Sequence, residues 1–132
     1  MADFSRRAGD ALRALVAAGR IKSAWVPGMR AIEPGRERGA RTCRDDDRMG
    51  TLARFLYHGA LPDPDDPLTV FGLLLLAREA WGEPGLYVGT ADGWYVTVPD
   101  SAAPWGGRVL TGATEAEAIV AALEAAVEAG RG

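Results

Sequence analysis

A long apolar run, Asp66–Trp81, limits the possible folds of this chain more than any other segment. Asp66 is a suitable N-cap, and Pro67 fits the first helical position, where a missing N–H costs nothing. Gly82 and Pro84 follow the run, and both residue types are typical of the segment just after a helix. The run therefore predicts a helix of about sixteen residues, roughly 24 Å long.

Apolar side chains occupy nearly all sides of this predicted helix. At about 100° per residue, one side carries Leu68, Phe71, Leu74, Leu75 and Arg78, and much of the rest carries Val70, Leu73, Leu76 and Ala77. A helix that is apolar nearly all round is buried. Arg78, Glu79 and the acidic residues before it make the segment too short and too charged to cross a membrane. We therefore expect a core helix with neighbours on more than one side.

Length and charge narrow the class of protein. A chain of 132 residues predicts a single domain, 1–132, and a net charge of −3 argues against a dedicated nucleic-acid binder. The single Cys43 excludes an internal disulfide and a multi-cysteine zinc site, and it suits a reducing cytosol. The N-terminus lacks the apolar core of a signal peptide, and no segment predicts a membrane span. We expect a cytoplasmic protein.

The N-terminal part, 1–60, predicts two helices separated by a charged loop. Amphipathic spacing predicts helices over 3–18 and 47–58. Between them, the loop 33–48 is almost devoid of apolar residues. Arg36, Arg38, Arg41 and Arg44 lie in this loop and could contact phosphates, although neighbouring acidic residues largely cancel their charge.

Trp25 and Met29 flank a turn signal, Val26–Met29, which contains Pro and Gly. Two interpretations of this pair stay open. Trp25 and Met29 could pack on the core together with Ile32, or they could form an exposed hydrophobic anchor for a partner protein.

The remaining segment, 61–132, predicts an α-β-β-β-α core. Residues 61–66 read as a stiff acidic connector, and strands are predicted at 86–88, 94–98 and 108–110, with a hairpin loop at 89–93. Thr114 and Glu117 form a capping box that begins a last helix, and Gly130 ends it. The predicted fold is α+β: a three-stranded antiparallel sheet packed against the buried central helix and the C-terminal helix, with two further N-terminal helices.

The residues give little material for catalysis or for a metal site. Asp63, Asp65 and Asp66 are spaced as Ca²⁺ or Mg²⁺ ligands could be, but adjacent prolines fix the backbone, which favours helix capping. Cys43 and His58 are too few for a zinc site, and one histidine cannot support most general-base schemes. We expect no enzyme activity, no cofactor and no metal.

Three aromatic residues, Tyr87, Tyr95 and Trp105, belong to the sheet region. On an open sheet face they could stack on RNA or form a binding hot spot for protein. Alternatively, residues 1–60 could cover them.

Two stretches resemble a family of bacteriophage proteins, the phage ABA-sandwich domain. Asp63-Pro64 with Asp66-Pro67 and then Gly72–Gly82 is similar to its central helix, and Thr114–Ala126 is similar to its closing helix. The resemblance covers 63–129 and implies a helix–sheet–helix fold and a phage or prophage origin. It supplies no catalytic residues.

Together these observations predict a non-enzymatic phage accessory protein that binds a host or phage protein in the cytoplasm of the bacterial host. Inhibition of a bacterial defence system, such as a CRISPR effector (an anti-CRISPR role), is one concrete form of this function. The partner-binding candidates are Trp25, Met29, Arg36, Arg38, Arg41, Arg44, Tyr87, Tyr95 and Trp105. The alternative is an accessory protein that binds nucleic acid through Arg36–Arg48 and the sheet aromatics, which predicts salt-sensitive binding.

Overall fold

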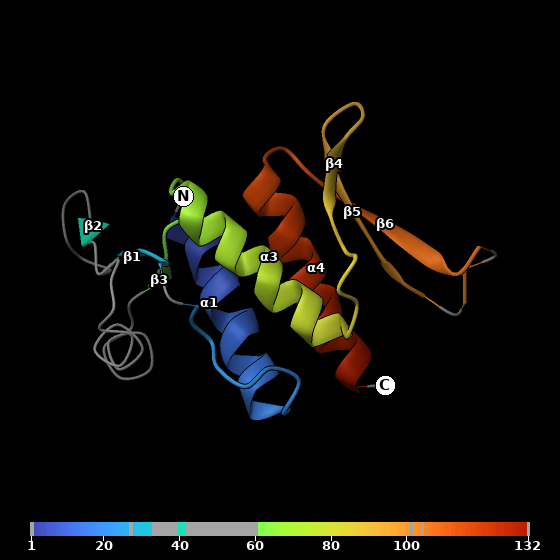
Figure 1. Cartoon of the computed structure of the whole chain (residues 1–132), viewed down its shortest axis with the longest axis horizontal. Helices are drawn as coiled ribbons and strands as arrows, with labels where there is room; N and C mark the ends of the chain where they lie inside the picture. The colour runs from blue at the N-terminus through green and yellow to red at the C-terminus, as the bar shows by residue number, and fades with distance from the viewer. Residues whose placement is uncertain are drawn as a thin grey trace.

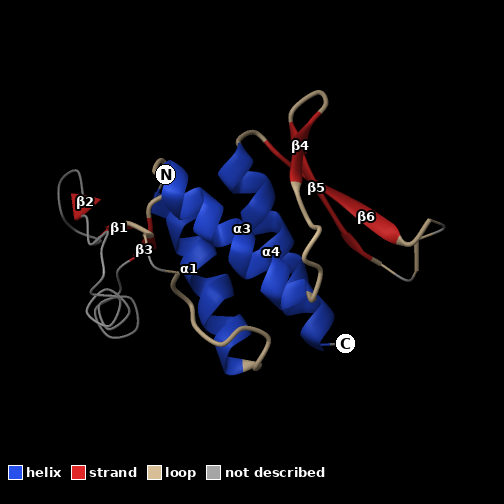
Figure 2. Cartoon of the chain, viewed as in Figure 1, coloured by secondary structure: helices blue, strands red, loops and turns tan. Residues whose placement is uncertain are grey.

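The computed structural model describes residues 2–26, 28–32, 40–41, 61–100, 102–103 and 105–131, and its helices and strands make the fold α+β, as expected (Figure 2). The elements in chain order are α1 (Ala2–Ala17), β1 (Ala31–Ile32), β2 (Ala40–Arg41), β3 (Leu61–Pro62), α3 (Pro67–Trp81), β4 (Val88–Thr90), β5 (Trp94–Pro99), β6 (Gly107–Gly112) and α4 (Glu115–Arg131). None of these helices is both long enough and apolar enough to cross a bilayer.

The three strands predicted after α3 form an antiparallel sheet in the order β4-β5-β6. Val88 pairs with Val96, and Thr97 pairs with Val109. The predicted first strand, 86–88, is displaced, because pairing begins only at Val88 and extends to Thr90. The third strand is longer than expected, since the whole segment Gly107–Gly112 pairs with β5.

A second small sheet, in the order β2-β1-β3, is absent from the sequence-based prediction. The loop 33–48 contains a strand at Ala40–Arg41, and the connector 61–66 begins with one at Leu61–Pro62, so both segments were wrongly predicted as irregular. Each strand has two residues, too few for a period-2 pattern to be recognised. Their pairing depends on segments that are distant in the chain, as in the pair Ile32–Leu61.

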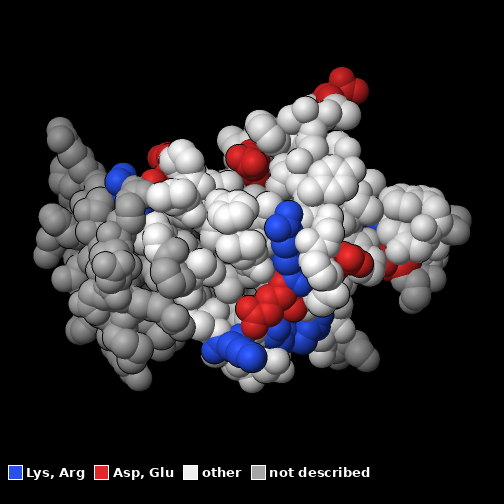
Figure 3. All heavy atoms as spheres, viewed as in Figure 1, with Lys and Arg blue, Asp and Glu red and all other residues white. Residues whose placement is uncertain are grey.

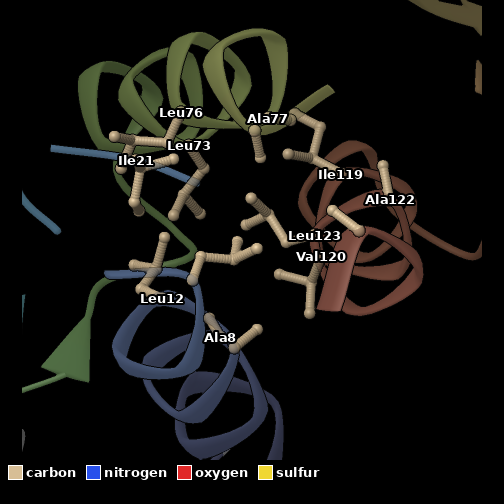
Figure 4. Packing of buried hydrophobic residues seen from close by; sticks show 14 of the residues in the cluster. Ala8, Leu12, Ile21, Leu73, Leu76, Ala77, Ile119, Val120, Ala122 and Leu123 are labelled. Carbon is tan, nitrogen blue, oxygen red and sulfur yellow. The ribbon is translucent and has the colours of Figure 1, made fainter. Parts of the chain in front are cut away.

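The helix α4 is the central element of the molecule (Figure 1). It contacts α1 and α3 on one side and the sheet β4-β5-β6 on the other. Its buried residues are Ala116, Ala118, Ile119, Val120, Ala122, Leu123, Ala125 and Ala126. The small alanine side chains of α4 allow neighbouring elements to approach it closely on several sides. Gly112 of β6 allows the same close approach from the sheet, because a Cβ atom there would lie only 2.5 Å from the backbone nitrogen of Ala118. The three helices share one apolar core (Figure 4).

The helix α3 has the predicted ends but not the predicted burial. The Asp66 carboxylate accepts hydrogen bonds from the Thr69 backbone N–H at 3.0 Å and from its hydroxyl at 2.7 Å, and Gly82 ends the helix at φ 63°. Leu73 and Leu76 are buried, whereas Leu68 is 51% exposed and Phe71 is 52% exposed. The expectation of burial on nearly all sides is therefore wrong, because α3 packs on α4 and leaves one side uncovered by the part of the chain that the structure describes.

Trp25 and Met29 belong to the core, with exposed fractions of 2% and 0%. Met29 lies directly against Gly72 of α3, where an added Cβ atom would come within 2.6 Å of the Met29 Cγ atom. The interpretation of this pair as an exposed anchor is therefore wrong, and the alternative of core packing is confirmed.

Several predictions fall outside the described residues. These are most of the loop 33–48, the helix 47–58, and the side chains of Arg36, Arg38, Cys43, Arg44 and His58; of Arg41, only the backbone is described, in β2.

Candidate functional site

The sheet β4-β5-β6 has one face on α4 and one face turned away from it, which we call the outer face. Along β5, Val96 and Val98 are buried toward α4, so the intervening Tyr95 and Thr97 lie on the outer face. The strand register places Thr111 beside Tyr95 and Val109 beside Thr97. The residues of the outer face are Tyr87, Gly89, Tyr95, Thr97, Pro99, Trp105, Gly107, Val109 and Thr111.

Tyr87 and Tyr95 form an edge-to-face pair on this face. Their ring centroids are 6.3 Å apart, and the rings meet at 73°. Gly89 makes room for this arrangement, because a Cβ atom there would lie 2.7 Å from the Tyr95 hydroxyl oxygen. Hydrogen bonding with the Tyr87 side chain and its charge raise the pKa of Tyr95 above its ordinary value of 10.0.

Trp105 lies at the other end of the outer face. Its ring covers Gly107, where a Cβ atom would approach the ring to 2.5 Å and the Thr97 methyl group to 3.0 Å. Trp105 is nevertheless 64% exposed, and Tyr87 is 56% exposed. The alternative in which residues 1–60 cover these aromatics is therefore wrong for both side chains.

A groove of about 360 Å³ runs between Tyr87 and Trp105. Leu86, Thr97, Val98 and Pro99 contribute to its lining, and Glu83 is the charged residue among those that line it. The Arg78 side chain donates a 2.7 Å hydrogen bond to the Leu86 carbonyl oxygen and so fixes the segment that leads into β4. Figure 3 shows a largely uncharged surface over β4, β5 and β6, with acidic residues at its margin.

The groove is lined mainly by apolar and aromatic residues, and Glu83 is the carboxylate among them. Its lining residues include no cysteine, histidine or lysine. Elsewhere among the described residues, no group of three or more acidic, histidine or cysteine side chains is arranged to hold a metal ion. Asp63 and Asp66 instead accept backbone hydrogen bonds from Asp65 and Thr69.

Of the predicted partner-binding residues, the structure brings Tyr87, Tyr95 and Trp105 together on one face. Trp25 and Met29 are buried elsewhere, and the four arginines lie outside the described side chains. Sequence reasoning missed Glu83 and Val109. The alternation of β6 could have placed Val109 on the outer face, but no sequence signal identifies Glu83, because it precedes β4 in a turn.

Comparisons with known proteins add no assignment. No protein-family model matches the chain, and no curated protein and no solved structure matches it either. The resemblance to the phage ABA-sandwich domain therefore stays a prediction.

Proposed function

We propose that the protein is non-enzymatic and acts by binding another protein through the outer face of the sheet β4-β5-β6. The observation that carries this proposal is the exposure of Tyr87 and Trp105 on a face whose strand residues carry no charge. Tyrosine and tryptophan are enriched at binding hot spots, and charged residues are depleted at the centres of interfaces. A rigid sheet backed by α4 also holds such side chains in fixed positions.

The resemblance to the phage ABA-sandwich domain supports a more specific form of the proposal. In this form the chain is a phage or prophage accessory protein, and its partner is a host or phage protein in the cytoplasm of the bacterial host. If the partner is a host defence protein, such as a CRISPR effector, the proposed function is inhibition of that defence system.

Nucleic acid is the second candidate partner, through Arg36–Arg48 and the sheet aromatics. The outer face itself offers no lysine or arginine to contact phosphate. The edge-to-face arrangement of Tyr87 and Tyr95 also presents less open ring surface for base stacking than two parallel rings would. These observations favour a protein partner.

The test is affinity capture from a lysate of the bacterial host with three forms of the protein. The wild-type chain is compared with Tyr87→Ala/Trp105→Ala on the outer face and with Leu68→Ala/Phe71→Ala, a control that removes two equally exposed apolar side chains from α3. We expect a partner that binds the wild type and the control, and that binds the outer-face variant at least about 30-fold more weakly, the loss typical of hot-spot residues.

Circular dichroism should show equal thermal stability for the three forms, because the substituted side chains are exposed. If the captured proteins do not depend on the outer face, the proposal is wrong. An electrophoretic shift of DNA or RNA at low salt, retained by the outer-face variant, would instead support the second candidate.

A further inference from the structure

We propose that the groove between Tyr87 and Trp105 binds a cationic side chain of the partner, and that arginine suits it best. This inference rests on the proposed protein-binding function and specifies the chemistry that the outer face recognises. It begins from the two aromatic walls, Tyr87 and Trp105, which line the same groove and are both more than half exposed. Electron-rich ring faces attract cations, and tryptophan does so most strongly.

The charge of the groove supports a cation rather than a neutral or anionic group. Glu83 lines the groove and forms no ion pair within the described part of the chain. A cation that enters between the rings would therefore also meet a carboxylate.

The basic residues nearest to the groove do not occupy it. The Arg78 side chain is held by the Leu86 carbonyl oxygen at 2.7 Å. Arg108 pairs with Val98, a residue of the face that lies against α4, so the alternation of β6 turns the Arg108 side chain away from the outer face. Neither of these two arginines of the described part of the chain supplies a cation to the groove, so we place that cation on a partner.

Arginine fits these walls better than lysine does. A guanidinium group is planar, stacks on aromatic rings and can donate two parallel hydrogen bonds to one carboxylate. A groove of about 360 Å³ is large enough for one such side chain together with adjoining backbone. The partner segment would therefore present an exposed arginine, flanked by small or apolar residues that lie on Thr97 and Pro99.

The test uses two tripeptides, N-acetyl-Gly-Arg-Gly-amide and its uncharged analogue with citrulline in place of arginine. Binding is followed by NMR through the indole Nε1–H resonance of Trp105, assigned with Trp105→Phe. We expect a saturable shift with the arginine peptide and at least about tenfold weaker binding of the citrulline peptide, because citrulline keeps the shape but loses the charge.

The Glu83→Gln variant should bind the arginine peptide about three- to tenfold more weakly, whereas Asp10→Asn on α1, which removes an exposed carboxylate far from the groove, should bind like the wild type. Equal binding of the two peptides, or no binding of either, would overturn the inference. A partner captured through Tyr87 and Trp105 that binds Glu83→Gln as tightly as the wild type would also overturn it, while leaving the proposed function intact.

Discussion

At the scale of single residues, glycines decide where the large side chains of the sheet can lie. Gly89 and Gly107 lie in strands, where glycine is usually unfavourable. A side chain at either position would collide with Tyr95 or Trp105, respectively. These two glycines therefore determine the shape of the candidate binding surface, although the sequence by itself marks Gly89 only as part of a hairpin loop.

The Tyr87–Tyr95 pair gives a prediction about pH. Replacing Tyr87 with Phe removes the hydroxyl group that raises the pKa of Tyr95, so this pKa should fall toward its ordinary value of 10.0. A pKa raised in the folded state contributes stability that is present below the unfolded value and is lost as the pH rises through the folded value. The wild type should therefore lose any stability advantage over Tyr87→Phe at pH values above 10.0.

The measurement is a pH titration of the Tyr95 ring carbon that bears the hydroxyl, followed by NMR. Trp105→Phe is the control, because it alters the same face without removing a partner of Tyr95. An unchanged Tyr95 midpoint in Tyr87→Phe would contradict the effect of Tyr87 on the pKa of Tyr95.

At the scale of elements, α3 shows how a helix can carry a glycine in its interior. Gly72 is buried, and it is the position at which the Met29 side chain meets α3. Alanine at this position would improve helix propensity by about 1 kcal/mol. It would also place a Cβ atom 2.6 Å from the Met29 Cγ atom and 2.9 Å from its sulfur atom.

We therefore expect Gly72→Ala to lower the free energy of unfolding by about 1 kcal/mol, since overpacking typically outweighs the gain in propensity. In a Met29→Ala background the collision is removed, and the same substitution should become stabilising. Urea unfolding of the two single variants and the double variant would measure this coupling. Additive effects would show that Met29 does not limit the space at Gly72.

At the scale of the whole molecule, Arg20 connects all three described helices. It follows α1, whose end is marked by Gly19 at φ 75°. Its Nε and one terminal nitrogen donate to the Ala80 carbonyl oxygen of α3 at 3.1 and 2.8 Å, and the other terminal nitrogen donates to the Ala126 carbonyl oxygen of α4 at 3.2 Å. The Ala80 carbonyl group belongs to the last turn of α3, where intrahelical partners are scarce, whereas Ala126 lies before the last turn of α4.

Replacing Arg20 with Lys keeps the charge but removes the forked geometry, so one helix should lose its partner. We expect the free energy of unfolding to fall by about 1–3 kcal/mol, the range for a lost hydrogen bond to a charged group in a partly buried position. Urea unfolding would measure this loss of stability, and the dependence of the free energy of unfolding on urea concentration should stay unchanged. Arg6→Lys, on the exposed side of α1, is the matched control and should change stability by less than about 0.5 kcal/mol.

The sequence by itself determined the ends of α3, the hairpin between β4 and β5, and the side of β5 that faces the core. Each of these depends on local chemistry: Asp66 and Pro67 begin a helix, Gly82 ends it, and alternation separates Val96 from Tyr95. For the candidate site, the alternation of side chains along β5 predicted that Tyr95 faces away from the core. Tyr87 and Trp105 were predicted as binding residues only because they are aromatic.

The tertiary structure alone decided which helix is central and which apolar residues are exposed. The helix α3 is richer in large apolar residues, yet α4 lies between the other helices and the sheet, because its alanines allow close approach on several sides. The tertiary structure also separates two tryptophans: Trp25 is buried in the core, whereas Trp105 lies exposed on the surface. A residue's type sets the free energy of burying it, whereas its burial depends on which distant segments pack beside it.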